Sequence, residues 1–141
     1  MKLATLRTGF GTSAIRIDGD NVGVELDYED VGQLLRSEDW RKAAQLSGEP
    51  VVFDHADLEA VVPNPGKIIC VGLNYAKHIR EMGREFPEHP TLFIKFADAL
   101  TGPYDDVLIP EYATQKLDYE GELAVIIGER AHRAVSYTHL R

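Results

Sequence analysis

The stretch "VVPNPGKIICVGLNY", residues 61–75, marks a change in the organisation of this chain. Pro63 and Pro65 stiffen the connection, because each proline ring fixes its backbone φ angle and removes a hydrogen-bond donor. The apolar run that follows, residues 67–71, predicts a buried strand that ends at Gly72. We therefore expect two domains: a small N-terminal domain of residues 1–62, and a second domain of residues 63–134.

The residues before this boundary predict a small α+β domain. Three short strand patterns lie in residues 2–8, 12–18 and 21–26. A Gly19-Asp20 turn would join the last two as a hairpin. Residues 29–46 carry apolar side chains at helical spacing, which predicts one or two amphipathic helices, with Ser37 capping a second one. Trp40 is expected to pack these helices onto the sheet, because its large ring suits a core position.

The composition excludes several classes of function. The chain has 141 residues and a formal net charge of −8, from 15 lysines and arginines against 23 aspartates and glutamates. This balance disfavours nucleic acid and anionic membranes as partners. The single cysteine, Cys70, cannot form an internal disulfide, and no apolar run approaches the roughly 18 residues of a membrane helix. We expect a cytoplasmic protein.

The first candidate for chemistry is the sequence "NYAKHIREMG", residues 74–83, which predicts a short helix capped by Asn74 and ended by Gly83. His78 and Glu81 are three residues apart, so their side chains share one face and can form a hydrogen bond. A carboxylate that holds one imidazole nitrogen makes the other more basic, as activation of a water molecule requires. The alternative is a solvated pair on an exposed helix, which the spacing alone favours.

Two further strands are expected after this helix. Residues 91–96 form an apolar pattern that Lys95 interrupts. Because burial of an unpaired ammonium group costs several kcal/mol, Lys95 must either reach the surface or point into a polar cavity. The turn sequence "GPYDD" then leads into "VLIP", residues 107–110, which predicts a short strand ended by proline.

The second candidate is "DYEGELAVIIG", residues 118–128, whose alternation predicts a strand with Asp118, Glu120 and Glu122 on one face. Both faces become apolar by residue 124, so we expect the strand to be covered on both sides and its acidic end to be carried inward. Neighbouring carboxylates repel unless a cation compensates them. A divalent ion such as Mg²⁺, Mn²⁺ or Ca²⁺ would do so. A solvated acidic edge strand is the alternative, and the pattern leaves both open.

The order of four motifs resembles the fumarylacetoacetate hydrolase family over residues 65 to about 134. The motifs are "VGLNYAKHIREM", "PTLFIK", "LIP" and "DYEGELAVIIG". The resemblance implies an α+β, β-rich protein in which a small N-terminal domain precedes a β-roll with the active site. It implies that Glu120 and Glu122 are paired metal ligands, that His78 and Glu81 form a dyad that activates water, and that Lys95 lines the substrate site. Asp118 would lie behind the ligands.

The chemistry that the resemblance implies is hydrolysis of a carbon-carbon bond in an acylpyruvate or related 1,3-dicarbonyl acid, such as fumarylpyruvate. The metal would stabilise enolate charge, and the short helix that ends at Gly83, with the loop at residues 84–90 that follows it, would act as a lid. The alternatives are an isomerase or decarboxylase of a related 2-oxo acid, of the 2-hydroxyhepta-2,4-diene-1,7-dioate type, and a ureidoglycolate lyase. A noncatalytic fragment is a further alternative. The full-length parent is expected to be a homodimer.

One departure from the family pattern concerns the end of the chain. The family supplies a further aspartate ligand from a segment beyond "ELAVIIG", in a pattern similar to Gly-Tyr-Thr followed by Asn-Asp, and this chain lacks that segment. Its last residues, "VSYTHLR", resemble the translated end of a transposon adapter. We therefore expect residues 135–141 to be a non-native tail, and the chain to be the first part of a longer enzyme that lacks the third ligand and much of the roll.

Overall fold

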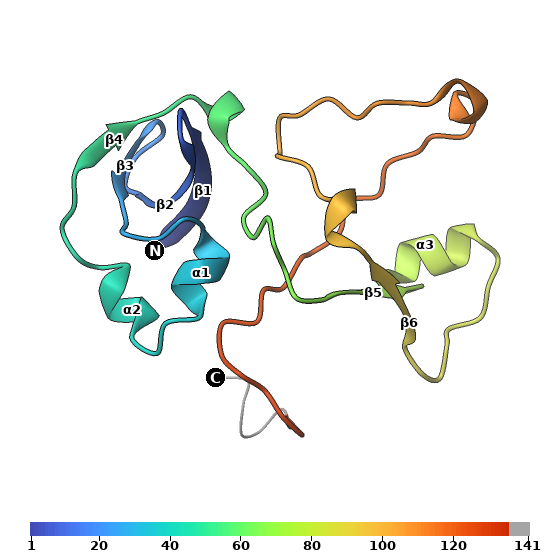
Figure 1. Cartoon of the computed structure of the whole chain (residues 1–141). Coiled ribbons are helices and arrows are strands. Elements are labelled where there is room, and N and C mark those ends of the chain that lie inside the picture. Colours follow the sequence, from blue (N-terminus) through green and yellow to red (C-terminus); the bar gives the residue numbers. More distant parts are fainter. Residues whose placement is uncertain (136–141) are drawn as a thin grey trace.

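The computed structural model describes residues 1–135, and it contains two separate sheets (Figure 1). The first sheet has four strands in the order β1-β2-β3-β4, and the second has two strands, β5 and β6. The predicted α+β fold, rich in strands, is confirmed. Among the described residues the second sheet does not close into a roll. The expected tail, apart from Val135, lies outside the described residues, and the expected domain boundary after residue 62 stays a prediction.

The first sheet is a chain of antiparallel neighbours. Its strands are β1 (Lys2–Thr8), β2 (Gly11–Ile17), β3 (Val22–Glu25) and β4 (Pro50–Val52). The predicted hairpin between β2 and β3 is confirmed, since the Asp18 amide donates to the Val22 carbonyl at 3.0 Å. The fourth strand was not predicted, because its three residues are too few to show an alternating pattern.

The first sheet has an apolar cluster on each face, as its alternating side chains require. On one face, the helix α1 (Val31–Leu35) covers β1 and β2, and the helix α2 (Trp40–Ala43) packs beside α1. The buried residues of this cluster are Ala14, Leu26, Val31, Leu34 and Ala44. The other cluster contains Ala4, Leu6, Ile15 and Phe53. Trp40 packs against the first cluster as predicted.

The predicted cap at Ser37 is wrong. Asp39 precedes α2 instead, and it makes no side-chain capping hydrogen bond. The Ser37 amide donates to the Leu34 carbonyl at 3.0 Å, so Ser37 continues the last turn of α1 rather than beginning a new helix. The first helix is capped by Asp30, whose carboxylate accepts from the Gln33 amide at 2.7 Å.

The connection to the second sheet runs along β1. After a 3-10 turn (His55–Asp57), Leu58 bridges to Leu6, and the Glu59 amide donates to the Thr5 carbonyl at 2.9 Å. The buried Thr5 hydroxyl donates to the Val61 carbonyl at 2.8 Å and accepts from the Val31 amide at 3.1 Å. The residues before the two prolines are therefore fixed to the first sheet.

The second sheet pairs β5 (Ile68–Gly72) with β6 (Thr91–Lys95) in antiparallel register, with α3 (Ala76–Glu81) between them in the sequence. Ile79 is the buried residue of this helix. Gly83 ends α3 as predicted: it has a φ of +62°, and its amide donates to the Arg80 carbonyl while the Arg84 amide donates to the Ile79 carbonyl. This pair of bonds is a Schellman motif, which favours glycine at the left-handed position.

Two predictions about the second sheet are wrong. The strand expected to be buried, β5, is mostly half-buried, and every residue of β6 is exposed, because no further layer of the described residues covers this sheet. Asn74 does not cap α3; Tyr75 occupies the cap position and makes no capping hydrogen bond.

The strands expected at residues 107–110 and 118–127 are also not formed. After β6 the described residues form only two 3-10 turns, η2 (Ala97–Ala99) and η3 (Glu111–Ala113). A strand needs a backbone partner, and neither segment pairs with any residue of 1–135. The expected covering of both faces is therefore wrong as well: the side chains of Leu108 and Leu123 are 89% and 82% exposed.

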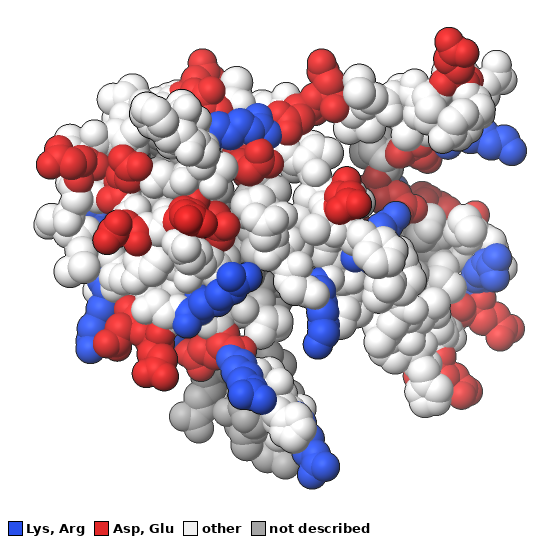
Figure 2. All heavy atoms as spheres, viewed as in Figure 1, with Lys and Arg blue, Asp and Glu red and all other residues white. Residues whose placement is uncertain are grey.

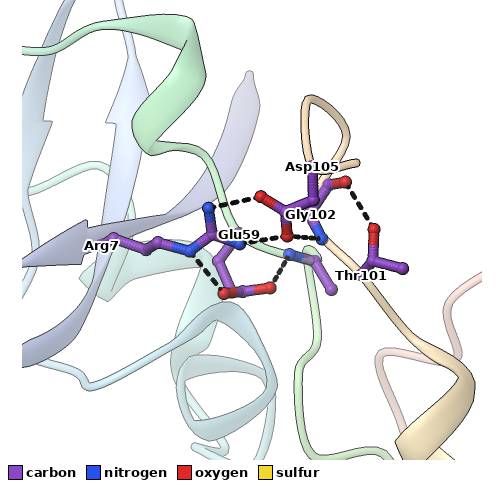
Figure 3. Close-up of polar contacts among 6 residues, drawn as sticks. Arg7, Glu59, Thr101, Gly102 and Asp105 are labelled. Atoms are coloured by element: carbon purple, nitrogen blue, oxygen red, sulfur yellow. Dashed lines mark hydrogen bonds and ion pairs between the residues drawn. The ribbon is translucent and has the colours of Figure 1, made fainter. Parts of the chain in front are cut away.

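The segment after β6 is held against the first sheet by a charged cluster (Figure 3). The Arg7 guanidinium binds Glu59 through Nε at 2.8 Å and Asp105 through Nη1 at 2.7 Å. The Gly102 amide also donates to Asp105, at 2.7 Å, and the ring of Tyr104 stacks on His55 with 5.8 Å between centroids. Hydrogen bonds from Arg7 hold the pKa values of both carboxyls below their ordinary range, helped by the backbone amides of Ala60 and Gly102.

The last described residues return between the two sheets and reach the helices of the first one (Figure 1). The Arg41 guanidinium binds Glu129 at 2.6 Å. A Cβ atom added to Gly128 would lie 3.6 Å from the Trp40 ring, so the backbone packs directly on this ring.

The surface shown in Figure 2 carries interleaved acidic and basic side chains, with no extended basic stripe on that face of residues 1–135. Within the same residues, no helix is long and apolar enough to cross a membrane.

Candidate active site

The candidate site lies where the acidic segment, residues 118–123, passes the beginning of α3. The Leu123 amide donates to the Tyr75 hydroxyl at 2.7 Å. A small pocket of about 90 Å³ lies between this segment and β5. Its lining residues are Ile69, Val71, Asn74, Tyr75, Glu122 and Leu123. The structure thus brings the acidic segment and the strand-to-helix turn together, although the two are nearly fifty residues apart in the sequence.

His78 faces Glu120 across this site. The distance from His78 Nε2 to Glu120 Oε1 is 3.8 Å, which is longer than a hydrogen bond but within the range of an ion pair. Both side chains are accessible, at 44% and 69% of their full exposure. A substrate could therefore reach the imidazole nitrogen and the carboxylate together.

Glu81 has a different partner from the one its spacing suggested. Its carboxylate lies 3.7 Å from the Lys77 ammonium, one turn back on α3, and no hydrogen bond joins it to His78 among the described residues. The imidazole instead has the carboxylate from the acidic segment as its neighbour. The catalytic role of the His78 and Glu81 pair stays a prediction.

Lys95 is placed away from these residues. It pairs with Ile68 in the β5–β6 ladder, while Gly72, which leads into α3, pairs with Thr91 at the opposite end. Its side chain is exposed, and it makes no hydrogen bond or ion pair with another residue of 1–135. The Lys95 side chain therefore reaches the surface rather than pointing into a polar cavity.

The carboxylates have the right chemistry for a divalent metal, but their set is incomplete. Glu120 and Glu122 offer hard oxygen donors of the type that Mg²⁺, Mn²⁺ and Ca²⁺ prefer. Asp118 binds its own neighbour, since one oxygen of its carboxylate accepts from the Tyr119 amide at 2.8 Å. Within residues 1–135, no three histidine, cysteine, aspartate or glutamate side chains come together closely enough to hold an ion. The donors fit the ion in kind, and further ligands are required.

An open groove of about 360 Å³ lies beside α3. One wall is the turn from β5 into α3, where Leu73 has a φ of +53°, and the other is the loop at residues 84–90, with Phe86 and His89. A left-handed backbone at a non-glycine residue is costly and is often found at functional sites. The loop is thus positioned beside α3 and the turn that precedes it, and the role of the helix and loop as a lid stays a prediction.

Tyr75 is the residue that sequence reasoning missed. Its hydroxyl group holds the backbone of the acidic segment, but a tyrosine before a short helix shows no spacing that would indicate this contact. Leu73 was missed for the same reason, because no sequence pattern predicts a leucine with a left-handed backbone.

Residues 67–139 match the family model described as fumarylacetoacetate (FAA) hydrolase C-terminal. This match covers just over half of the chain, and the chain belongs to the fumarylacetoacetate hydrolase family. Enzymes of this family generally use divalent metals.

Among its relatives are enzymes that act on a 2-oxo acid. The mitochondrial oxaloacetate tautomerase FAHD2A of Bos taurus is 49% identical over 71 residues, which are 50% of this chain and 22% of the relative. The oxaloacetate tautomerase YisK of Bacillus subtilis is 47% identical over 89 residues, covering 59% of this chain and 30% of the relative. The chain thus spans less than a third of the length of either relative.

The fold is similar to that of a crystal structure of a protein assigned as HpcE from Mycobacterium smegmatis. The TM-score is 0.62 at 27% sequence identity, and the similarity covers 79% of this chain and 41% of the other. The likeness therefore extends beyond the family match into the N-terminal sheet.

Proposed function

We propose that this chain carries part of the active site of an enzyme that interconverts the keto and enol forms of a 2-oxo dicarboxylic acid of the oxaloacetate class. The observation that carries the proposal is the position of His78, which faces Glu120 at 3.8 Å rather than Glu81. An imidazole beside a carboxylate is suited to proton transfer, and a tautomerase needs no activated water. The names of the two tautomerase relatives support the same reaction.

The proposed reaction moves one proton and makes or breaks no other bond to the substrate skeleton. Neutral His78 accepts a proton at Nε2 from the carbon next to the keto group, and the electron pair of that C–H bond forms the enolate. The imidazolium then returns the proton to the enolate oxygen. The Glu120 carboxylate faces the imidazole of His78 through both transfers.

Glu120 and Glu122 are proposed to hold a divalent ion, Mg²⁺ or Mn²⁺, with Ca²⁺ as a further candidate, together with ligands beyond the described residues. When bound, such an ion stabilises negative charge on the substrate oxygen atoms. A carboxylate has two oxygens, so Glu120 can serve both the ion and His78. Lys95 lies at the opposite end of the β5–β6 ladder from α3, so no proton transfer is given to it here, and its role in lining the substrate site stays a prediction.

Hydrolysis of an acylpyruvate is the second candidate. The groove beside α3 and its loop favour it, because they offer a place from which water could be excluded. This reaction requires Glu81 to turn away from Lys77 and hold the imidazole of His78. The two candidates therefore differ in their need for Glu81.

The distinguishing experiment compares Glu81→Gln with His78→Ala in the same protein. Oxaloacetate tautomerisation is followed by ultraviolet absorbance of the enol form, and acylpyruvate cleavage by loss of the diketone absorbance, each with Mg²⁺ or Mn²⁺ and with a chelator. We expect His78→Ala to remove tautomerisation while Mn²⁺ binding is kept, and Glu81→Gln to keep most of the tautomerase rate. Cleavage of an acylpyruvate that Glu81→Gln abolishes would instead establish the hydrolase.

The metal ligands are tested by calorimetric titration of the full-length parent protein with Mn²⁺. We expect Glu120→Gln and Glu122→Gln each to weaken binding by at least about tenfold, because each removes a charged oxygen ligand. Unchanged Mn²⁺ affinity in both variants would contradict the assignment. Asp118→Asn is the matched control, since it removes one negative charge from the same segment at a residue that is not proposed as a ligand.

The compartment and the assembly state are also proposals. We propose a cytoplasmic, homodimeric parent protein, although FAHD2A and several other relatives are mitochondrial. Sedimentation of the purified protein would measure the assembly state directly.

A further inference from the structure

We propose that Tyr75 is a positioning residue whose hydroxyl group holds the acidic segment beside His78. This inference rests on the proposed function, because Glu120 and Glu122 of that segment are its acidic groups. Tyr75 itself contacts no reacting atom in the proposed chemistry. Its effect would pass through the backbone of the segment.

The contact between Tyr75 and Leu123 is short and direct. The Leu123 amide donates to the Tyr75 hydroxyl at 2.7 Å. Within residues 1–135, it is the one hydrogen bond that joins residues 118–127 to the rest of the chain. This segment has no strand partner there, so besides the packing of residues 128–129 on the helices of the first sheet, its position depends on that bond and on the approach of Glu120 to His78.

The Tyr75–Leu123 and His78–Glu120 contacts have the same sequence spacing on α3 and on the acidic segment. Tyr75 and His78 are three residues apart at the beginning of α3, and their partners Leu123 and Glu120 are three residues apart in the opposite direction. Tyr75 meets the backbone at one end of this stretch, and His78 faces a carboxylate at the other. The acidic segment is therefore held antiparallel to the first turn of α3.

The backbone before α3 determines where the Tyr75 hydroxyl lies. Leu73 has a φ of +53°, which turns the chain sharply after β5. Tyr75 then has an extended backbone, with φ −111° and ψ 119°, immediately before the first helical residue. Its side chain therefore lies beside the small pocket that Glu122 and Leu123 also line.

The acidic side chains of this segment repel one another, so a contact that fixes its backbone helps to keep them in place. Asp118, Glu120 and Glu122 place three negative charges within five residues, and like charges favour separation of the side chains. Without the hydroxyl group, the Leu123 amide would turn to water, and the two glutamates would sample a wider range of positions. A metal or a substrate would then have to order them on binding.

The test compares Tyr75→Phe with Tyr119→Phe. The first variant removes the hydroxyl that binds Leu123 and keeps the ring. The second removes a hydroxyl that is in the same segment, belongs to a 91% exposed side chain and makes no hydrogen bond with another residue of 1–135. Amide hydrogen exchange at Leu123 is measured by NMR without metal or substrate, and Mn²⁺ binding is measured by calorimetry, both in the full-length parent protein.

We expect exchange at Leu123 to become about fivefold faster in Tyr75→Phe, as loss of one ordinary hydrogen bond implies, and Mn²⁺ affinity to fall by a similar factor. Tyr119→Phe should change neither. Unchanged exchange at Leu123 would overturn the contact, and faster exchange with unaltered Mn²⁺ affinity would overturn the positioning role. Absence of tautomerase activity in the unmodified protein would count against the proposed function alone, because neither readout uses a substrate.

Discussion

Gly102→Ala tests the charged cluster that holds the segment after β6 against the first sheet. Gly102 is buried, and a Cβ atom added to it would lie 2.6 Å from the Leu58 carbonyl oxygen and 2.6 Å from Arg7 Nη2. Both distances are shorter than real Cβ contacts, so the neighbours must move. The Arg7 side chain can move easily, but the Leu58 backbone is bridged to Leu6 in β1. The turn at residues 102–105 is therefore expected to leave the sheet.

The cost follows from this overlap. Overpacking of a well-packed position destabilises a protein by about 1–3 kcal/mol. With a urea slope of about 2 kcal/mol per molar, a loss of about 2 kcal/mol lowers the unfolding midpoint by about 1 M. Fluorescence of Trp40, which packs on the first sheet, reports the transition.

Gly66→Ala is the matched control, because a Cβ atom added there meets nothing within 4 Å and the backbone has no left-handed φ. Amide exchange at residues 101–105 should rise in Gly102→Ala and stay unchanged in the control. The same midpoint in both variants, with unaltered exchange at residues 101–105, would refute the reasoning that this cluster is packed as the structure has it.

Three further predictions concern the charged cluster around Arg7 and the stability of α3. Glu59 and Asp105, which Arg7 binds, have lowered pKa values in the folded protein. They therefore stabilise the folded state above their unfolded pKa values of about 4, and this stabilisation is lost as the pH falls through their folded pKa values. Arg7→Gln should make the unfolding free energy depend less on pH in this acid range. Gly83→Ala should destabilise α3 by about 1 kcal/mol relative to Gly66→Ala, because its φ of +62° is left-handed, and equal helix exchange rates in the two would contradict this. Ile79→Ala should cost about 2–5 kcal/mol in the stability of α3, measured by exchange of its amides; protection kept at the original level would mean that its burial does not hold the helix.

The sequence by itself determined the local elements of the first sheet and the end of α3. Residues 2–8 form the predicted strand without change, because alternation in a strand depends only on the order of side chains. Gly83 ends α3 because a left-handed backbone is a local property that glycine accepts. The resemblance of four motifs to the fumarylacetoacetate hydrolase family was confirmed by the family match.

Tertiary structure decided everything that depends on a distant partner. The pattern of residues 118–127 is that of a strand, but a strand forms only where another backbone meets its amides, and none of residues 1–135 does so. Spacing placed Glu81 within reach of His78, whereas the fold brought Glu120 there from a segment far along the chain. Tyr75 acquired its contact with Leu123 in the same way. The amino-acid sequence therefore determines which chemical groups are present, and packing between distant segments determines which of them face one another.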